Sequence, residues 1–278
     1  MSLELSGVGF TYGAGTEWAL SALADVSLSV EPGSLLLVVG PTGSGKSTLL
    51  RLAAGLLEPE SGSIMIDGRG LDASVLGRDV GIVFQSPESQ LFAETLLEDV
   101  SFGPLNLGAS RDVAESEARN ALDAVGLPAA AFEGRSPFAL SGGEARRAAL
   151  AGVIAMHPRY LLADEPTSGL DAAGREAVRS VLAAMRAESG VVIVTHDVEE
   201  FLDAADSVLV LSEGREVFCG PAATLVGDPT PLAAADLRAP EVLRVQALAR
   251  ESGLAVEAFE LDPDRAARNL ALAGGWLG

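Results

Sequence analysis

A glycine-rich segment that contains the only lysine of the chain limits the folds that this sequence can adopt. All other basic residues, among 19 lysines and arginines, are arginines. The pattern G-x-x-x-x-G-K-[ST] wraps backbone N–H groups around the β-phosphate of a nucleotide, its lysine reaches the β- and γ-oxygens, and its serine hydroxyl binds Mg²⁺. The segment consists of Gly40, Pro41, Thr42, Gly43, Ser44, Gly45, Lys46, Ser47 and Thr48.

The flanking residues agree with a phosphate-binding loop. The run Leu35–Val39 is continuously apolar, as in a buried parallel strand, and residues 47–54 have the composition of a helix. A glycine-rich turn without a ligand is the simpler alternative, and the complete strand–loop–helix order disfavours it. The sequence therefore predicts an α/β fold of the P-loop NTPase type that binds a nucleoside triphosphate with Mg²⁺.

Composition narrows the choice of partner and compartment. A formal net charge of −20 argues against nucleic acid as the main partner and against unassisted binding to anionic lipid. The single cysteine, Cys219, excludes a disulfide framework and a cysteine-based metal site, and it favours the cytosol as the compartment. The simplest interpretation of Cys219 itself is a small apolar residue near a strand end.

No segment of the sequence has the length of a transmembrane helix. The longest apolar runs, such as Leu35–Val39 and Val191–Val194, have the size of strands, far below the roughly 20 residues that span a bilayer. The first residues lack the features of a signal peptide. We therefore expect a soluble chain whose role at a membrane, if it has one, depends on a partner.

The pattern of strands and helices indicates an interrupted core. Strand-like runs precede and follow a stretch from about residue 87 to 158 that is rich in Ala, Leu and Arg with helical spacing. We expect a nucleotide-binding domain over residues 1–220 with an inserted helical subdomain. Residues 221–278 form a C-terminal extension with scattered helical patterns.

Two adjacent carboxylates follow a second buried-strand pattern. The run Tyr160–Asp164 is apolar up to its last residue, and Glu165 and Pro166 come next. A carboxylate at a strand end beside a P-loop is where a Mg²⁺-associated aspartate is expected, so we assign that role to Asp164. Glu165 is the candidate general base that polarises the attacking water. An acidic turn before a proline is the alternative.

A second candidate anion site lies at Leu140–Glu144. Ser141 is a predicted helix N-cap, and Glu144 three residues later completes a capping box. A helix N-terminus that carries two glycines, Gly142 and Gly143, also suits a phosphate group. The local cap and the anion site are compatible interpretations.

Two further polar residues follow predicted strands. His196 comes directly after the strand pattern that ends at Thr195, where it can contact a γ-phosphate, although an isolated histidine is more often structural. Gln85 ends the strand pattern that starts at Val80, and its amide is a candidate ligand of Mg²⁺ or of the attacking water. His157 has no such neighbours and is interpreted as a loop residue.

Taken together, these residues resemble the ATPase subunits of ABC transporters. The resemblance covers about residues 3–220 and implies ATP as the nucleotide. It also implies a head-to-tail dimer in which ATP lies between the P-loop of one subunit and the signature of the other. The motifs in order are the P-loop ending at Ser47, a Q-loop glutamine at Gln85, a signature at Leu140–Glu144, a Walker B motif ending at Asp164 and Glu165, a D-loop at residues 168–171 and a switch His196.

The same resemblance assigns further roles. Ser141 and Gly143 would bind the partner's ATP, and Asp171 of the D-loop would belong to the nucleotide-binding residues, as would Gly142 and Glu144. Tyr12 resembles the aromatic residue that stacks on adenine, with Phe10 and Trp18 as nearby alternatives. Glu144 stands where many members have glutamine. No catalytic position departs from the pattern, so we expect an active ATP hydrolase.

A narrower resemblance, to the energy-coupling factor (ECF) importers, lies in residues 84–92 and 100–108. It implies a membrane coupling protein and a substrate-binding membrane subunit as partners, with uptake of a vitamin or a transition-metal ion. In that family the region after the Q-loop receives coupling helices that carry arginines, and the extension after Pro221 helps the ATPases to pair. Four acids that are candidates for meeting a basic partner, or for a solvated helix face, are Glu88, Glu94, Glu98 and Asp99.

Three functions remain to be compared. The favoured one is the ATP-hydrolysing subunit of an ECF importer, located in the cytoplasm on the inner face of the membrane, with a second ABC ATPase, identical or paralogous, as its pair. An ordinary ABC transporter subunit differs only in its membrane partners. A soluble ABC ATPase acting on ribosomes or DNA is disfavoured by the acidic pI of about 4.4.

Overall fold

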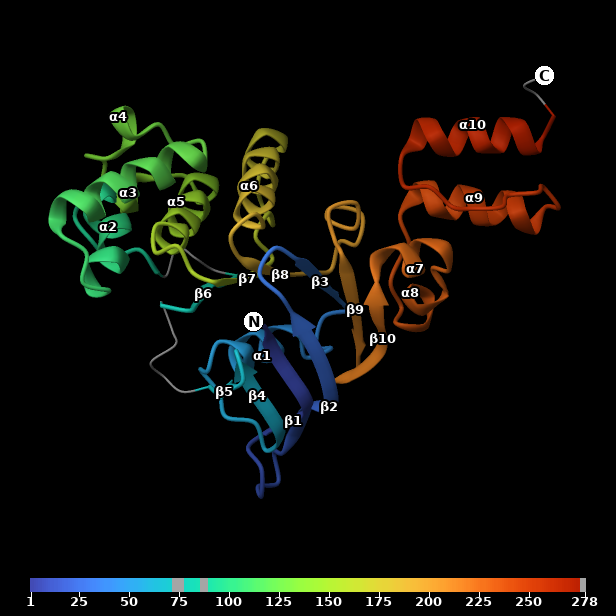
Figure 1. Cartoon of the computed structure of the whole chain (residues 1–278), viewed down its shortest axis with the longest axis horizontal. Helices are drawn as coiled ribbons and strands as arrows, with labels where there is room; N and C mark the ends of the chain where they lie inside the picture. Colours follow the sequence, from blue (N-terminus) through green and yellow to red (C-terminus); the bar gives the residue numbers. More distant parts are fainter. Residues whose placement is uncertain (72–77, 86–89, 276–278) are drawn as a thin grey trace.

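Two β-sheets of different type form the core of the computed structural model, which describes residues 1–71, 78–85 and 90–275 (Figure 1). The larger sheet has the strand order β10-β9-β3-β8-β7-β6. All its pairings are parallel except that of β9 with β10. Its strands are β3 (Leu35–Val39), β6 (Val80–Val83), β7 (Tyr160–Asp164), β8 (Gly190–Thr195), β9 (Ser207–Ser212) and β10 (Arg215–Pro221).

The central strand β3 shows why the run Leu35–Val39 is continuously apolar. All five residues are buried, and they alternate between two hydrophobic clusters. Leu35 and Leu37 face the cluster that the sheet shares with the helices above it, whereas Leu36 and Val38 face the cluster below. A parallel strand covered on both faces has no solvent-facing side, so every position is apolar.

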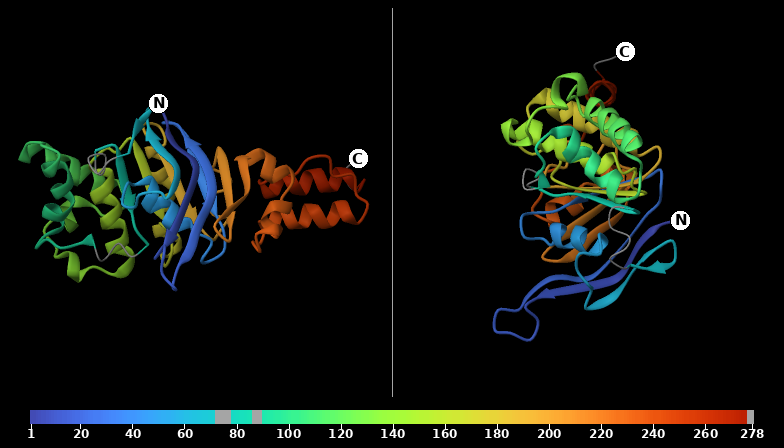
Figure 2. Two further views of the ribbon diagram at one scale, coloured as in Figure 1. Left: turned by 90° about the horizontal axis from the view of Figure 1, so that it is seen from below. Right: turned by 90° about the vertical axis from the view of Figure 1, so that its left-hand side faces the viewer.

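The lower cluster is closed by a four-stranded antiparallel sheet of order β2-β1-β4-β5. The P-loop helix α1 (Lys46–Ala53) lies between the two sheets, and its Leu49, Leu50 and Leu52 are buried there. The side view in Figure 2 shows this layering. The strands are β1 (Leu3–Tyr12), β2 (Leu20–Val30), β4 (Ser61–Ile66) and β5 (Arg69–Gly70).

A group of helices follows β6 in the sequence and lies at one end of the molecule (Figure 1). The local sequence explains where several of these helices begin, because Thr95, Ser110 and Ser141 cap them through side-chain oxygens. The described part of the predicted helical subdomain is indeed mainly helical. Its helices are α2 (Leu96–Asn106), α3 (Arg111–Ala124), α4 (Ala129–Phe132) and α5 (Gly142–Ile154), and α6 (Ala172–Met185) covers the sheet next to them.

The residues after β10 are mostly helical and lie at the opposite end from α2–α4 (Figures 1 and 2). A buried amide fixes part of this region: Gln246 donates to the carbonyls of Val242 (2.9 Å) and Glu260 (2.8 Å) and accepts from the Glu260 N–H. Among the described residues no helix is long and apolar enough to cross a bilayer. The helices are α7 (Ala222–Gly227), α8 (Thr230–Ala234), α9 (Glu241–Glu251) and α10 (Pro263–Ala273).

Candidate active site

The predicted phosphate-binding loop connects the end of β3 to the start of α1 (Figure 1). Two of its glycines are required by close backbone approaches. A Cβ atom on Gly40 would collide with the Leu211 carbonyl oxygen, and one on Gly45 would collide with that of Ala22. Gly45 also precedes α1 without supplying a side-chain cap, so the first N–H groups of the helix remain available to a phosphate.

Lys46 is buried within this loop. Its ammonium donates to the carbonyl oxygens of Gly40 (2.7 Å) and Pro41 (2.9 Å). Burial lowers the pKa of Lys46, and the nearby charges of Glu165 and Asp164 oppose that shift. Because the Lys46 ammonium is poorly solvated in the loop, binding of an anionic ligand beside it is favourable.

The predicted metal-binding residues lie together. Asp164 ends β7 beside the P-loop; burial raises the pKa of its carboxyl, while a hydrogen bond with the Ser47 hydroxyl acts in the opposite direction. The buried Ser44 hydroxyl has no hydrogen-bond partner among the described residues, as suits a loop that binds a polar ligand. One hydroxyl and one carboxylate beside a phosphate site fit Mg²⁺, which binds through few protein ligands and completes its shell with phosphate oxygens and water.

Glu165 has a strained backbone and a defined orientation. Its φ of 49° lies in the left-handed region that non-glycine residues seldom adopt. Its N–H donates to the Val194 carbonyl (2.8 Å), and its Oε1 accepts from the His196 N–H (3.0 Å). His196 Nδ1 also lies 2.7 Å from the same oxygen, while the rest of the histidine is largely exposed. The two residues predicted to act on the γ-phosphate side therefore form a hydrogen-bonded pair.

A cavity of about 280 Å³ is lined by Lys46, Ser47, Asp164 and Glu165, whereas His196 does not line it and is linked to it through Glu165. Gln85 also lines it. So does Tyr12, whose hydroxyl lies 3.3 Å from the Thr48 Oγ1 atom. Of the two aromatic alternatives, Phe10 packs edge-on against Tyr12 (4.9 Å between ring centroids), and neither Phe10 nor Trp18 lines the cavity.

Sequence reasoning missed one wall of this cavity, formed by Leu20, Ser21 and Ala22 at the start of β2. These residues reach the site because β2 pairs with β1, with Tyr12 opposite Leu20. The glycines after Tyr12, Gly13 and Gly15, are the sequence signal of a turn between two strands. A hairpin at this turn would have placed residues 20–22 near that tyrosine.

The second candidate anion site lies outside this cavity. Ser141 caps α5 by accepting from the Glu144 N–H (3.3 Å), and the Glu144 carboxylate accepts from the Ser141 N–H (2.7 Å), so the predicted capping box is present. These backbone and hydroxyl hydrogen bonds, followed by the charge of Arg135, lower the pKa of Glu144. Gly142 is exposed and Gly143 partly so, and none of residues 140–144 lines the P-loop cavity.

Asp171 is likewise remote from the P-loop cavity. Its carboxylate accepts from the Gly174 N–H (2.8 Å) and thereby caps α6. The structure thus assembles the P-loop, Gln85, Asp164 and Glu165 in one place but leaves the signature residues and Asp171 elsewhere on the same chain.

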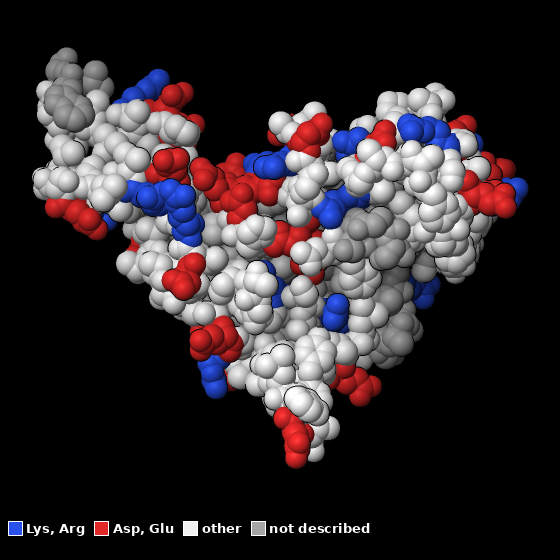
Figure 3. Space-filling model, turned by 180° about the vertical axis from the view of Figure 1, so that it is seen from behind, with Lys and Arg blue, Asp and Glu red and all other residues white. Residues whose placement is uncertain are grey.

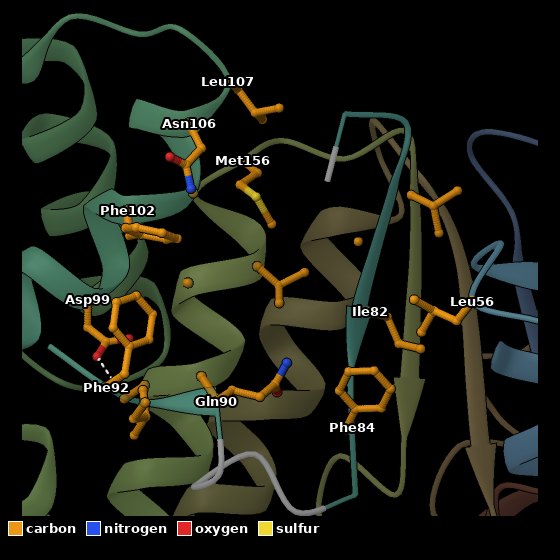
Figure 4. Close-up of a pocket in the computed structure, with 18 residues that line it drawn as sticks. Leu56, Ile82, Phe84, Gln90, Phe92, Asp99, Phe102, Asn106, Leu107 and Met156 are labelled. Carbon is orange, nitrogen blue, oxygen red and sulfur yellow. Dashed lines mark hydrogen bonds between the residues drawn. The ribbon is translucent and has the colours of Figure 1, made fainter. Parts of the chain in front are cut away.

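A larger groove of about 410 Å³ lies beside the site, between β6 and α2 (Figure 4). Its lining is mainly apolar, with Ile82 and Phe84 on one side, Phe102 on the other and Met156 between them. Phe92 and Phe102 are exposed in it by 57% and 47% and pack edge-on against each other. Exposed aromatic side chains of this extent in a concave surface indicate a binding site.

Two of the four acids expected either to meet a basic partner or to form a solvated helix face bond to nearby backbone, and Glu94 is exposed. Asp99 is buried and accepts from the N–H groups of Phe92 and Ala93 (both 2.8 Å), and Glu98 accepts from the Thr95 N–H in a capping box. Both carboxylates are engaged by their own backbone, while Glu88 lies outside the described residues. The groove therefore offers apolar contacts more than negative charge.

Comparison with known proteins identifies the family. A family model described as ABC transporter matches residues 23–168. The chain belongs to the ABC transporter family. This ABC ATPase is 41% identical over 282 aligned positions to the energy-coupling factor transporter ATP-binding protein EcfA2 of Symbiobacterium thermophilum, with 99% of this chain and 98% of that protein covered. It is 42% identical to the protein of the same name from Ligilactobacillus salivarius, with 82% of each chain covered.

Solved structures agree with this family and fold. The ABC ATPase matches cbiO1 of Clostridium perfringens, described as part of the ABC transporter complex cbiONQ, with a TM-score of 0.72, 32% identity and coverage of 88% and 98%. It also matches a dimeric bacterial ABC transporter cassette, MJ0796, with a TM-score of 0.72, 29% identity and coverage of 80% and 99%. The predicted resemblance, the P-loop NTPase fold and the assignment as an ATP hydrolase are thereby confirmed.

Proposed function

We propose that this ABC ATPase is the ATP-hydrolysing subunit that energises an ECF-type importer for a vitamin or a transition-metal ion. The observation that carries the proposal is the junction at the end of β6. Phe84 lines the apolar groove, and the next residue, Gln85, lines the P-loop cavity. A structural change in the P-loop cavity can thus reach the apolar groove, which we take as the docking surface, through two adjacent residues. The names of the relatives support the ECF assignment.

The chemistry follows from the residues around the P-loop. Lys46 and the free N–H groups at the start of α1 bind the phosphates, and Ser47 and Asp164 would hold Mg²⁺, with Gln85 in the same cavity. Bound Mg²⁺ supplies positive charge against the β- and γ-phosphate oxygens. Glu165 accepts the proton of the attacking water as general base, and His196, bonded to its carboxylate, fixes its orientation.

A second ABC ATPase, identical or paralogous, completes each site. The signature residues lie on an exposed helix N-terminus away from their own P-loop cavity, so they are available to a nucleotide bound by another subunit. Asp171 lies on the same interface in this proposal. The helices α9 and α10 add exposed apolar side chains, Val245, Leu248 and Leu272, that we assign to pairing of the two ATPases.

The groove binds helices of a membrane coupling protein, which in turn contacts a substrate-binding membrane subunit. An amphipathic helix lays apolar anchors into such a groove. Phe102 and Met156 are the contacts that we expect to matter most. The chain then works in the cytoplasm on the inner face of the membrane. On the face shown in Figure 3 acidic side chains gather in the central hollow and arginines lie singly, which disfavours nucleic acid there.

Purification of the tagged protein from gently solubilised native membranes tests the proposal. We expect a polytopic coupling protein and a substrate-binding membrane subunit to co-purify, and Phe102→Glu to reduce their recovery at least about 10-fold, because a charge is costly in an apolar interface. Val113→Glu is the matched control, since Val113 is exposed on α3 of the same helical group and does not line the groove.

The outcomes separate the alternatives. Recovery of membrane subunits of a different kind would leave an ordinary ABC transporter. Recovery of ribosomes alone would refute a transport role, and equal recovery with both variants would refute the groove as the docking surface.

A further inference from the structure

One arginine of the signature helix contacts two motifs that are distant in sequence. Arg146 lies five residues after Ser141, in the second turn of α5. Its Nη2 atom donates to the main-chain carbonyl oxygen of Gln85 at 2.8 Å, across 61 positions of sequence. The bond is made to the backbone, so it holds the end of the segment from β6 whatever the Gln85 side chain binds.

The other arm of the same guanidinium faces the D-loop. Gly169 has a φ of 74°, and a Cβ atom built on it would lie 3.6 Å from the Arg146 Nη1 atom. That is ordinary contact distance, so the Nη1 atom lies close to the D-loop at Gly169. Arginine can serve two such neighbours at once, because its planar fork carries several donors in fixed directions, whereas the lysine ammonium is a single point.

The next residue, Arg147, has a different environment. A Cβ atom on Gly174 would lie 3.0 Å from the Arg147 Nη1 atom, so this side chain packs against the first turn of α6. Its Nε atom is buried, and within the described part of the chain it has no hydrogen-bond partner. Arg147 therefore contributes to packing between α5 and α6, and only Arg146 reaches Gln85.

We propose that Arg146 is a positioning residue that couples the two nucleotide sites of the dimer. It ties Gln85, which lines the chain's own P-loop cavity, to the helix whose N-terminus acts on the partner's nucleotide. Closure of the signature on that nucleotide moves α5, and Arg146 transmits the movement to the carbonyl of Gln85. The inference rests on the proposed function, because it requires a signature that acts across the dimer.

The kinetic effect of Arg146→Ala tests this role. We expect kcat to fall roughly 10-fold, the scale of one hydrogen bond from a charged donor, while KM for ATP changes less than about 2-fold, because Arg146 does not line the P-loop cavity. Arg111→Ala is the control, since Arg111 is an exposed arginine on α3 whose side chain only approaches Glu115. It should behave like the wild type.

A double-mutant cycle with Gln85→Ala decides whether Arg146 acts through Gln85. If it does, Arg146→Ala in the Gln85→Ala background should lower kcat by less than about 2-fold further. Independent roles would multiply the two losses, and that result, or a kcat equal to that of Arg111→Ala, overturns the proposal. Should Arg146→Ala fail to fold, Arg146→Lys replaces it in the same cycle, with a smaller loss expected. Mixing Ser141→Arg subunits with Glu165→Gln subunits tests the proposed function separately, because recovered activity requires a signature that acts across the dimer.

Discussion

The chain contains two helix N-termini suited to phosphate, and they are built differently. At the start of α1 the N-cap is Gly45, which makes no side-chain bond, and the surrounding cavity contains Lys46 and Asp164. At the start of α5 the N-cap is Ser141, whose capping box with Glu144 already occupies part of the hydrogen-bonding capacity. The first N-terminus lies in a cavity with charged groups, whereas the second is exposed and carries an anion of its own.

This difference gives the two helix N-termini different expected affinities for phosphate. An uncapped N-terminus with a buried cation binds phosphate strongly by itself. A capped and exposed N-terminus beside a carboxylate binds an anion weakly, so it contributes only when another surface presents the phosphate. The contrast predicts that damage to the first site removes chemistry or binding, and that damage to the second removes cooperation between subunits.

The largest effect is expected from Glu165→Gln at the first site. Loss of the general base should slow hydrolysis about 10²–10⁴-fold while ATP binding is retained. Phosphate release at saturating ATP measures the rate, and nucleotide binding is measured on the same sample. Glu188→Gln makes the same chemical change at an exposed position and should leave both unchanged. Near-normal turnover would remove Glu165 from the catalytic role.

Lys46→Ala should weaken ATP binding about 100-fold. The variant loses a charge-assisted contact to the β- and γ-phosphates, which in a buried site is worth close to the upper end of the range for such bonds. Equilibrium titration with ATP measures the change, and Arg69→Ala on the exposed strand β5 controls for net charge. Unchanged affinity would show that the α1 terminus is not the binding site, and with it the contrast between the two helices would fail.

The second site should act only across the interface, and mixing two inactive variants tests this. Ser141→Arg breaks the signature and Glu165→Gln breaks the general base. A mixed dimer retains one intact composite site if the signature acts on the partner's nucleotide. Random pairing should then restore roughly a quarter of the wild-type activity, because half the dimers are mixed and each has one working site. Mixing without any recovery would place both motifs on the same nucleotide.

Much of the first site was predictable because each of its signals is local. The P-loop spacing and the apolar run ending in Asp164 and Glu165 need only the residues beside them. The topology of parallel strands then brings β3 and β7 to the same edge of the sheet, with β8 between them. The capping box of Ser141 and Glu144 was predictable for the same reason.

What the sequence could not reveal depends on contacts between distant segments. The bond from Arg146 to the Gln85 carbonyl joins a helix to a strand end, and no periodicity encodes it. The cavity wall at Leu20 depends on the register of a hairpin. The acids near the groove are a different case, because the capping box from Thr95 to Glu98 is a local signal that was overlooked. Its presence gives Glu98 a local role at the start of α2.

The smallest effect concerns the carboxylate at the second site. Glu144→Gln keeps an acceptor for the Ser141 N–H but loses the charge at the start of α5, which should lower the free energy of unfolding at pH 7 by about 0.3–1 kcal/mol. The folded state lowers the pKa of Glu144. The charged carboxylate therefore stabilises the fold fully at pH values above the unfolded-state pKa of about 4.3. This stabilisation is lost as the pH falls through the lower pKa of the folded state.

Urea unfolding of the wild type and Glu144→Gln at pH 7 and at successively lower pH measures this difference. The two proteins should differ at neutral pH and converge in acid, because the wild-type carboxyl then becomes neutral like the amide. A gap that persists in acid would mean that the amide disturbs the cap itself. A variant more stable at neutral pH would mean that the carboxylate destabilises the folded state, which would overturn the expected sign of its contribution.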